Sequence, residues 1–328
     1  MNRNNLIYSL IISLVFFCSL TSCSDDDDKN GLLKNDCIEY TRGRPKVAGT
    51  DIEFTYAIAM PYGSGKIQEA WVEATIPGAD GTWMEHNSYH TSGGIDVPVK
   101  VGNSSETVEN KTTVEFTRDT CAAALRYYYK VPDEARGKSV SFRFFAKADN
   151  GETISYSMGP YQISKVEMAL DIPLTRANCY ISIEDMKVYN ATDAASIADK
   201  IDLIYNYRNF NSEGIEFGHV FASPVADPVY LYGMTLPEGL NRDVKIHSVF
   251  GAMDYHLARI DTEGLKFVDD LDFETKKFDN MPNYAVNMKT KSGMWVETQD
   301  GKYRAFIYVN SVRVIAGATI SMKRYTMK

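Results

Sequence analysis

Two histidines four residues apart come nearest, by type and spacing, to forming a metal site. His86 and His90 stand in Glu85-His86-Asn87-Ser88-Tyr89-His90, and on a helix this spacing would place both imidazoles on one face. In zinc-binding helices of that kind a glutamate base follows the first histidine, whereas Asn87 follows it here. The sequence offers no third ligand nearby and predicts a loop rather than a helix. We therefore expect surface histidines and no metal.

Two other short motifs each lack a residue that their chemistry needs. Gly63-Ser64-Gly65-Lys66 has the Gly-Lys pair of a phosphate-binding loop, but Met60 replaces the earlier glycine and Ile67 the following hydroxyl residue. Asp270-Leu271-Asp272-Phe273-Glu274 spaces its carboxylates like the start of a calcium loop, but Thr275 stands where the turn requires glycine. No Gly-x-Ser-x-Gly nucleophile motif occurs. The sequence therefore predicts no catalytic residue, no cofactor and no enzyme activity.

The best candidates for ligand binding are Trp83 and Tyr89. They lie in the stretch from Trp83 to Gly94, where polar and aromatic residues mix without a clean period, which predicts an irregular loop. An exposed indole is a flat apolar platform with one polar edge, suited to stacking on a sugar ring or to anchoring a protein partner. Its neighbours could hydrogen-bond sugar hydroxyls: Glu85, His86, Asn87 and Ser88. The alternative is that Trp83 folds back and caps the core.

Short strands separated by turns are expected to position these residues. From Asp51 to Met60 apolar side chains alternate with others, which indicates a strand with one buried face. The same alternation recurs from Ala122 to Val131 and from Ser139 to Ala148, and Asp149-Asn150-Gly151 predicts a hairpin turn. About seven or eight such strands without a long helix predict an immunoglobulin-like β-sandwich over residues 36–165.

The second half of the chain is less regular. It combines predicted strands with a short helix that starts near Thr192 or Asp193 and an amphipathic helix within Lys266 to Phe278. Alternation stops between Lys165 and Pro173, so the domain boundary is expected there. Residues 174–328 would form a β-rich domain with short helices. The predicted fold class is mainly β, with an N-terminal immunoglobulin-like β-sandwich and a C-terminal β-rich (α+β) domain.

The first residues predict export. Residues 1–22 contain a basic start and the apolar run from Leu6 to Leu20, which is shorter than the roughly 20 apolar residues of a membrane-spanning helix. Thr21-Ser22-Cys23, with Leu20 before it, resembles the lipobox of bacterial lipoproteins. The resemblance implies cleavage before Cys23 and attachment of a diacylglyceryl group, with palmitate-type acyl chains, to its sulfur. The alternative is an ordinary cleaved signal with a chance cysteine.

An acidic segment follows in the tether of residues 23–35. Ser24 and Asp25, Asp26, Asp27 and Asp28 resemble the export tag of Bacteroidetes surface lipoproteins, which directs transfer to the outer leaflet. The resemblance implies a lipid-anchored protein on the outer surface of the outer membrane. The alternative is a solvated acidic spacer, because runs of like charge repel and stay disordered.

The other cysteines leave two alternatives open. Cys18 leaves with the signal, and Cys37, Cys121 and Cys179 remain in the body of the protein. Disulfides persist beyond the inner membrane, and Cys37 and Cys121 fall in the same domain, so they could form a bridge. The alternative is that unpaired cysteines are buried as small hydrophobic residues.

The export signal and the β-sandwich half, with two short segments of the second half, resemble an uncharacterised family of Bacteroides-type outer-membrane lipoproteins. The segments are Lys200-Ile201-Asp202-Leu203-Ile204-Tyr205 and Thr298-Gln299-Asp300-Gly301-Lys302-Tyr303. Because that family is one of unknown function, the resemblance implies a location and a fold but no active site.

Charge and composition narrow the classes of partner. The chain has 35 basic and 43 acidic residues, a net charge of −8 and no basic cluster, so nucleic acid is not an expected partner. A hydrophobic content of 44% with 24% charged residues is typical of globular domains. The sequence thus predicts a non-enzymatic cell-surface lipoprotein. It would be a glycan-binding accessory in polysaccharide capture or, alternatively, a structural or adhesive module that binds protein partners.

Overall fold

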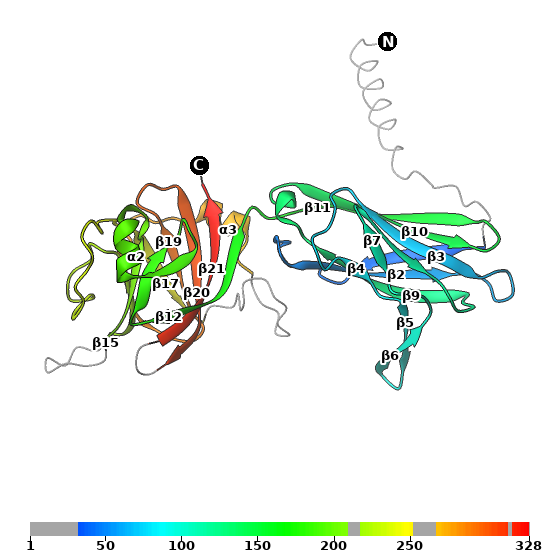
Figure 1. The fold of residues 1–328 in the computed structure, drawn as a ribbon, viewed down its shortest axis with the longest axis horizontal. Coiled ribbons are helices and arrows are strands. Elements are labelled where there is room, and N and C mark those ends of the chain that lie inside the picture. The colour runs from blue at the N-terminus through cyan, green and yellow to red at the C-terminus, as the bar shows by residue number, and fades with distance from the viewer. Residues whose placement is uncertain (1–31, 209–216, 252–266, 314–316, 328) are drawn as a thin grey trace, which may run out of the picture.

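The protein forms two lobes built mainly of antiparallel β-sheets (Figure 1). The computed structural model describes residues 32–208, 217–251, 267–313 and 317–327. We call residues 32–163 the N-terminal lobe and the described residues from 164 to 327 the C-terminal lobe. The predicted fold class is confirmed: strands dominate both lobes and the described helices are short. No described helix is long and apolar enough to span a membrane.

The N-terminal lobe is a sandwich of two sheets. One sheet has the order β1-β2-β9-β4, and the other has the order β11-β10-β3-β8-β7. Their bounds are β1 (Lys34–Glu39), β2 (Asp51–Ala59), β9 (Ala122–Lys130), β4 (Trp83–Met84), β11 (Thr153–Gln162), β10 (Ser139–Ala148), β3 (Ile67–Ala74), β8 (Lys111–Glu115) and β7 (Glu106–Val108). A one-turn 3-10 helix, η1 (Asp133–Ala135), precedes β10.

Alternation along the strands fills the core between these sheets. In β2 every second residue from Ile52 to Ile58 is buried, and the residues between them face outward. The Phe54 ring lies 4.8 Å from Phe142 and 5.3 Å from Phe144, both on β10 of the opposite sheet. Aromatic contacts between the sheets therefore hold the sandwich together.

A hairpin projects from this sandwich where the sequence predicted an irregular loop. β4 pairs with β9, and β5 (Asn87–Ser92) pairs with β6 (Ile95–Lys100) as a separate two-stranded sheet that extends away from the lobe (Figure 1). The prediction of a loop from Trp83 to Gly94 is therefore wrong. β5 carries polar residues on both faces, so no alternating pattern marks it in the sequence, whereas Ile95, Val97 and Val99 of β6 do alternate with other residues.

The C-terminal lobe also contains two five-stranded sheets. One has the order β12-β21-β20-β19-β17, and the other has the order β14-β13-β15-β16-β18. Their bounds are β12 (Glu167–Thr175), β21 (Gly317–Thr326), β20 (Tyr303–Arg313), β19 (Ser292–Glu297), β17 (Lys245–Phe250), β14 (Lys187–Asn190), β13 (Asn178–Ser182), β15 (Leu203–Arg208), β16 (Gly218–Ala222) and β18 (Tyr284–Met288). Buried side chains from both sheets form one hydrophobic core.

The helices of this lobe are shorter than the sequence predicted. α2 (Ala191–Ser196) begins after Asn190, whose side chain accepts a hydrogen bond from the Asp193 backbone, and η2 (Ala198–Lys200) follows. α3 (Asp270–Thr275) is capped by Asp269, and its buried residue is Phe273. Leu271, expected on the buried face of an amphipathic helix, is exposed. Lys266, the expected start of that helix, lies outside the described residues.

The connection between the lobes also differs from the prediction. The segment from Lys165 to Pro173 was expected to lack strand structure, but β12 begins at Glu167 and pairs with β21. β12 is an edge strand, and its apolar residues Met168, Leu170, Ile172 and Leu174 do alternate with the others, so the prediction overlooked a pattern that the sequence contains. Pro173 is accommodated because an edge strand does not need every N–H. Asp270 of α3 accepts hydrogen bonds from the Ser164 hydroxyl and the Lys165 backbone N–H.

Asp270→Ala should expose the junction between the lobes to protease. Loss of two hydrogen bonds to a charged carboxylate should weaken the local structure by at least about 1.5 kcal/mol and speed tryptic cleavage after Lys165 roughly tenfold. Mass spectrometry of timed digests measures this rate. Asp279→Ala, an exposed substitution near the same helix, is the matched control. Equal cleavage rates in the two variants would show that Asp270 does not hold the junction.

Candidate functional site

Polar and aromatic side chains gather on the outer face of the sheet β1-β2-β9-β4. Because Phe54 and Tyr127 point into the core, their neighbours Glu53 and Tyr128 point outward. The strand register places Glu53 opposite Tyr128, and Tyr128 opposite Trp83 of β4. Tyr40, just after β1, donates its backbone N–H to the Glu53 carbonyl. We call Tyr40, Glu53, Tyr128 and Trp83 the aromatic strip.

Trp83 stacks on Tyr128 within this strip. The ring centroids lie 4.9 Å apart with an angle of 12° between the planes. Trp83 belongs to strand β4 rather than to an irregular loop, and at 42% exposure it is not folded into the core. The cross-strand contact fixes the orientation of the indole and leaves much of its surface open to solvent.

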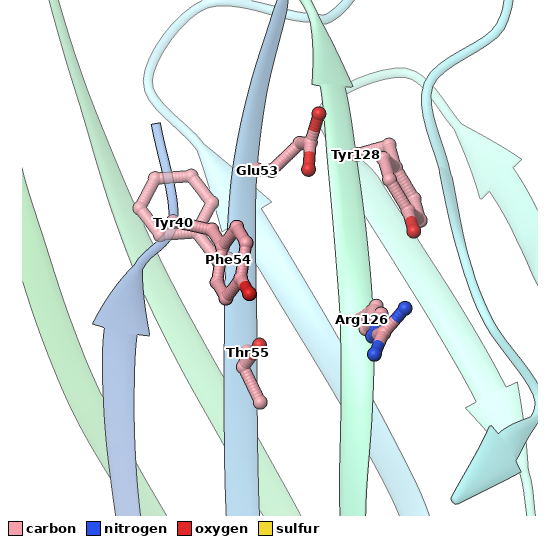
Figure 2. Close-up of a pocket in the computed structure, with 6 residues that line it drawn as sticks. All are labelled: Tyr40, Glu53, Phe54, Thr55, Arg126 and Tyr128. Atoms are coloured by element: carbon pink, nitrogen blue, oxygen red, sulfur yellow. The ribbon is translucent and has the colours of Figure 1, made fainter. Parts of the chain in front are cut away.

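A small hollow adjoins the stacked pair. Its volume is about 60 Å³, and Figure 2 shows its lining residues on β2, β9 and the end of β1. Tyr40 at one side is 68% exposed, while Glu53 and Thr55 lie between it and the side chains of β9. The hollow thus combines a carboxylate, hydroxyls and aromatic surface. Groups of these kinds can hydrogen-bond and stack on a polyhydroxylated ligand.

Arg126 brings the second predicted residue, Tyr89, to the same surface. Arg126 lies two residues before Tyr128 on β9, and its guanidinium carbon is 4.1 Å from the centre of the Tyr89 ring. Its Nη2 atom is 2.7 Å from Oδ2 of Asp96 on β6. The guanidinium therefore fastens the projecting hairpin to the sheet. Trp83 and Tyr89, the two predicted ligand-binding residues, thus contact Tyr128 and Arg126. These two are successive outward-facing residues of β9.

Glu85 links the two tyrosines of this surface. Oη of Tyr128 lies 3.4 Å from Oε1 of Glu85. Hydrogen bonding to Glu85 is the main cause that raises the pKa of Tyr89. Burial raises the pKa of Tyr128, and the charges of Glu85 and Glu53 add to this while Arg126 opposes it. Both phenols therefore stay neutral near pH 7 and can donate hydrogen bonds.

Sequence reasoning missed the partners of Trp83. Tyr40, Glu53, Arg126 and Tyr128 were not singled out. A signal existed, because the alternation predicted from Ala122 to Val131 puts Tyr127 and Tyr129 on the buried face, which leaves Arg126 and Tyr128 on the solvent face.

The cysteines of the described chain are free thiols. The alternative of a Cys37–Cys121 bridge is contradicted because the two residues are far apart. Cys37 pairs with Tyr56, which pairs with Leu125, so Cys121 lies two strands away and four residues along. At about 4.8 Å per strand and 3.3 Å per residue this separation far exceeds the roughly 7 Å limit for a disulfide. Burial raises the pKa of Cys37, and it raises that of Cys179 to about 11, so neither is a reactive thiolate.

The remaining predicted residues do not join this site. His90 lies on β5 and His86 just before it, so the chain between them is extended and spans about 13 Å, too far for both to bind one ion. The described residues contain no cluster of three or more potential metal ligands. Cys23, Ser24 and Asp25 to Asp28 lie outside the described residues.

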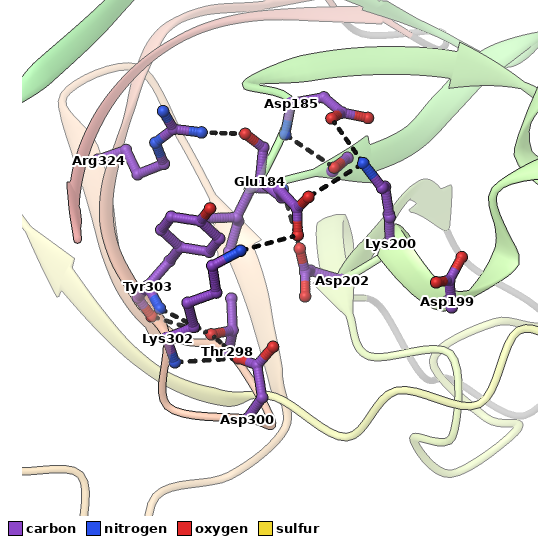
Figure 3. A network of polar contacts seen from close by, with 12 residues as sticks. Glu184, Asp185, Asp199, Lys200, Asp202, Thr298, Asp300, Lys302, Tyr303 and Arg324 are labelled. Carbon is purple, nitrogen blue, oxygen red and sulfur yellow. Dashed lines mark hydrogen bonds and ion pairs between the residues drawn. The ribbon is translucent and has the colours of Figure 1, made fainter. Parts of the chain in front are cut away.

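A second polar cluster lies in the C-terminal lobe and joins the two short segments quoted above (Figure 3). Glu184 lies between Lys200 of one segment and Lys302 of the other, with Nζ···Oε distances of 3.0 Å and 3.8 Å. Nearby, Nε of Arg242 is 2.7 Å from Asp202, and its Nη2 is 3.5 Å from Asp300. The sequence did not predict that these two segments lie close together. Their charges meet as ion pairs that connect the two sheets.

Comparison with known proteins identifies the family. The model of a domain of unknown function, DUF4466, matches residues 30–163, and that of a second, DUF8576, matches residues 164–327. The crystal structure of a DUF4466 family protein from Parabacteroides merdae is 41% identical, with a TM-score of 0.84 over 90% of this chain and 99% of the other. The chain belongs to the DUF4466 family. The expectation of a family of unknown function is thus confirmed, whereas lipid attachment and the outer-membrane location stay predictions.

More distant structures add nothing to the assignment to DUF4466. The fimbrial adhesin FimA of Actinomyces is 9% identical with a TM-score of 0.29, over 86% of this chain and 89% of the other. The major pilin SpaD of Corynebacterium diphtheriae is 7% identical with a TM-score of 0.30, over 81% of this chain and 55% of the pilin chain. Similarities this low support no inference about function. No curated protein matches the chain.

Proposed function

We propose that this DUF4466 protein is a lipid-anchored protein of the outer cell surface that binds a glycan at the aromatic strip without hydrolysing it. The observation that carries the proposal is the stacked pair of Trp83 and Tyr128, which stays exposed beside a polar hollow. The predicted lipobox at Cys23 and the acidic tag after it support the location.

The chemistry of the strip suits a sugar ring. A pyranose has an apolar face of C–H groups and a rim of hydroxyls, so it needs a flat aromatic surface and nearby hydrogen-bonding groups. Trp83 supplies the surface, and Glu53, Thr55 and Tyr128 supply acceptors and donors. These residues stand on paired strands, so the site is formed before a ligand arrives.

Trp83→Ala should weaken glycan binding about three- to tenfold, because an aromatic contact contributes roughly 0.5–1.5 kcal/mol beyond area burial. The melting temperature should change little, since Trp83 lies outside the core. A glycan array on the purified protein identifies the ligand, and titration calorimetry with thermal melts compares the variants.

Trp71→Ala is the matched control. Trp71 lies on β3 of the other sheet and stacks on Phe145 at 4.8 Å and 6°. Lys111 and Arg143 lie over these two rings, so their faces are occupied. The control should keep full glycan affinity. An array without any bound glycan would reject the proposal and favour a module that binds protein partners.

A further inference from the structure

The surface around the aromatic strip combines a paired cation with an unpaired carboxylate. Arg126, the cation that lines the hollow, is already paired with Asp96 and covered by Tyr89. The Glu53 carboxylate, by contrast, forms no hydrogen bond or ion pair with the residues that the structure describes. Oε2 of Glu85 is buried and also lacks a hydrogen-bond partner within the described chain.

Two other cations near the strip, Lys130 and Lys46, are engaged as well, and a third, Arg44, lies at a different cavity. Lys130 lies 2.9 Å from Asp51 on the neighbouring strand, and Lys46 lies 2.7 Å from Glu39. Arg44 lines a separate cavity between the lobes. Burial lowers its pKa, and the charges of Glu39 and Glu53 oppose that shift. Glu53 therefore presents an unpaired carboxylate at the hollow, and Glu85 adds negative charge behind it.

We infer that the strip binds uncharged glycans and rejects those bearing carboxylates or sulfates. This inference rests on the proposed glycan-binding function and specifies its substrate class. Glu53 accepts hydrogen bonds from hydroxyls, which are the donors that a neutral sugar offers. An anionic group placed near Tyr128 would meet the charges of Glu53 and Glu85 and find Arg126 occupied by Asp96. Like charges at such distances repel even in water, and salt weakens the repulsion.

Glu53 is therefore expected to determine specificity. At low salt the wild-type protein should bind a neutral mannan or glucan at least about tenfold more tightly than polygalacturonic acid or chondroitin sulfate, and high salt should narrow the gap. Glu53→Gln removes the charge but keeps the size of the side chain, so it should strengthen binding of the anionic polymers severalfold. Affinity electrophoresis in gels that contain each polymer measures both effects.

Glu115→Gln is the matched control, because Glu115 is an exposed carboxylate on β8 of the opposite sheet. It should leave the preference unchanged and report the effect of net charge alone. Anionic polymers that bind the wild type as tightly as neutral ones would overturn the inference while leaving the proposed function intact. Failure of every polymer and of the glycan array would overturn both.

Discussion

Asp202→Ala should lower the free energy of unfolding by about 3–5 kcal/mol, the cost of breaking a buried ion pair. The Asp202 side chain is 1% exposed and that of Arg242 16%. One Asp202 oxygen lies 2.7 Å from Nε of Arg242, and the other accepts the Ile183 backbone N–H at 2.9 Å. The substitution leaves the buried Ile183 N–H without its acceptor and the Nε of the largely buried Arg242 without its carboxylate, although the guanidinium keeps the Asp199 carbonyl and Asp300. Urea denaturation monitored by tryptophan fluorescence measures the loss.

Asp199→Ala is the control for this variant, because Asp199 lies three residues earlier with an exposed side chain. It should change the unfolding free energy by less than about 0.5 kcal/mol. If Asp202→Ala were equally mild, the ion pair would not contribute to the stability of the C-terminal lobe.

Asp202 also gives the stability a pH dependence. Burial raises its pKa from 3.8 to about 6, and Arg242 and the Ile183 N–H oppose the shift without cancelling it. The folded state holds the proton of the Asp202 carboxyl more tightly than the unfolded state. The stability gained from this protonation is fully present below about pH 4 and is lost as pH rises through about 6. The difference in stability between the wild type and Asp202→Asn should therefore shift by up to about 3 kcal/mol over this window.

Cys23→Ala should move the protein from the membrane fraction to the soluble fraction. Each buried CH₂ of an acyl chain contributes about 0.8 kcal/mol, so a doubly or triply acylated cysteine holds a protein stably and its removal leaves no anchor. Fractionation followed by immunoblotting measures the change. Cys18→Ala is the control, because Cys18 lies within the predicted signal. This variant should remain in the membrane fraction. A Cys23→Ala protein that remained in the membrane fraction would contradict the lipoprotein assignment.

The acidic tag should determine transfer to the outer surface of the cell and have no effect on lipid attachment. Replacement of Asp25 to Asp28 by alanine should keep the protein in the membrane fraction but protect it from protease added to intact cells. Digestion of the wild type with protection of this variant would support surface transfer through the tag.

Much of the N-terminal fold could be predicted from the sequence because its strands alternate. Ile52 to Ile58 on β2 and Tyr127 with Tyr129 on β9 are buried as their period of two implies. β5 of the projecting hairpin escaped prediction because neither of its faces is buried, so hydrophobic periodicity contains no signal for it. β12 does alternate, through Met168, Leu170, Ile172 and Leu174, and was overlooked.

The candidate site could be predicted only in part. Trp83 was recognisable as an aromatic residue among polar neighbours, but Glu53 and Tyr128 are 75 residues apart in the sequence and meet only through the β2–β9 register. Pairing of distant strands depends on how the whole sandwich packs, which local patterns do not specify. The same holds for Asp202 and Asp300, which meet at Arg242.

The exposed hairpin has one more consequence, which concerns self-association. β6 is an outer strand of a two-stranded sheet, and such edges offer unpaired backbone groups to strands of neighbouring molecules. Pro98 in the middle of β6 has no N–H to offer, and Asp96 and Lys100 place charges on the same strand. These residues disfavour a continuous sheet between copies. A protein crowded on a surface could thus expose a long hairpin and still remain free of edge-to-edge polymerisation.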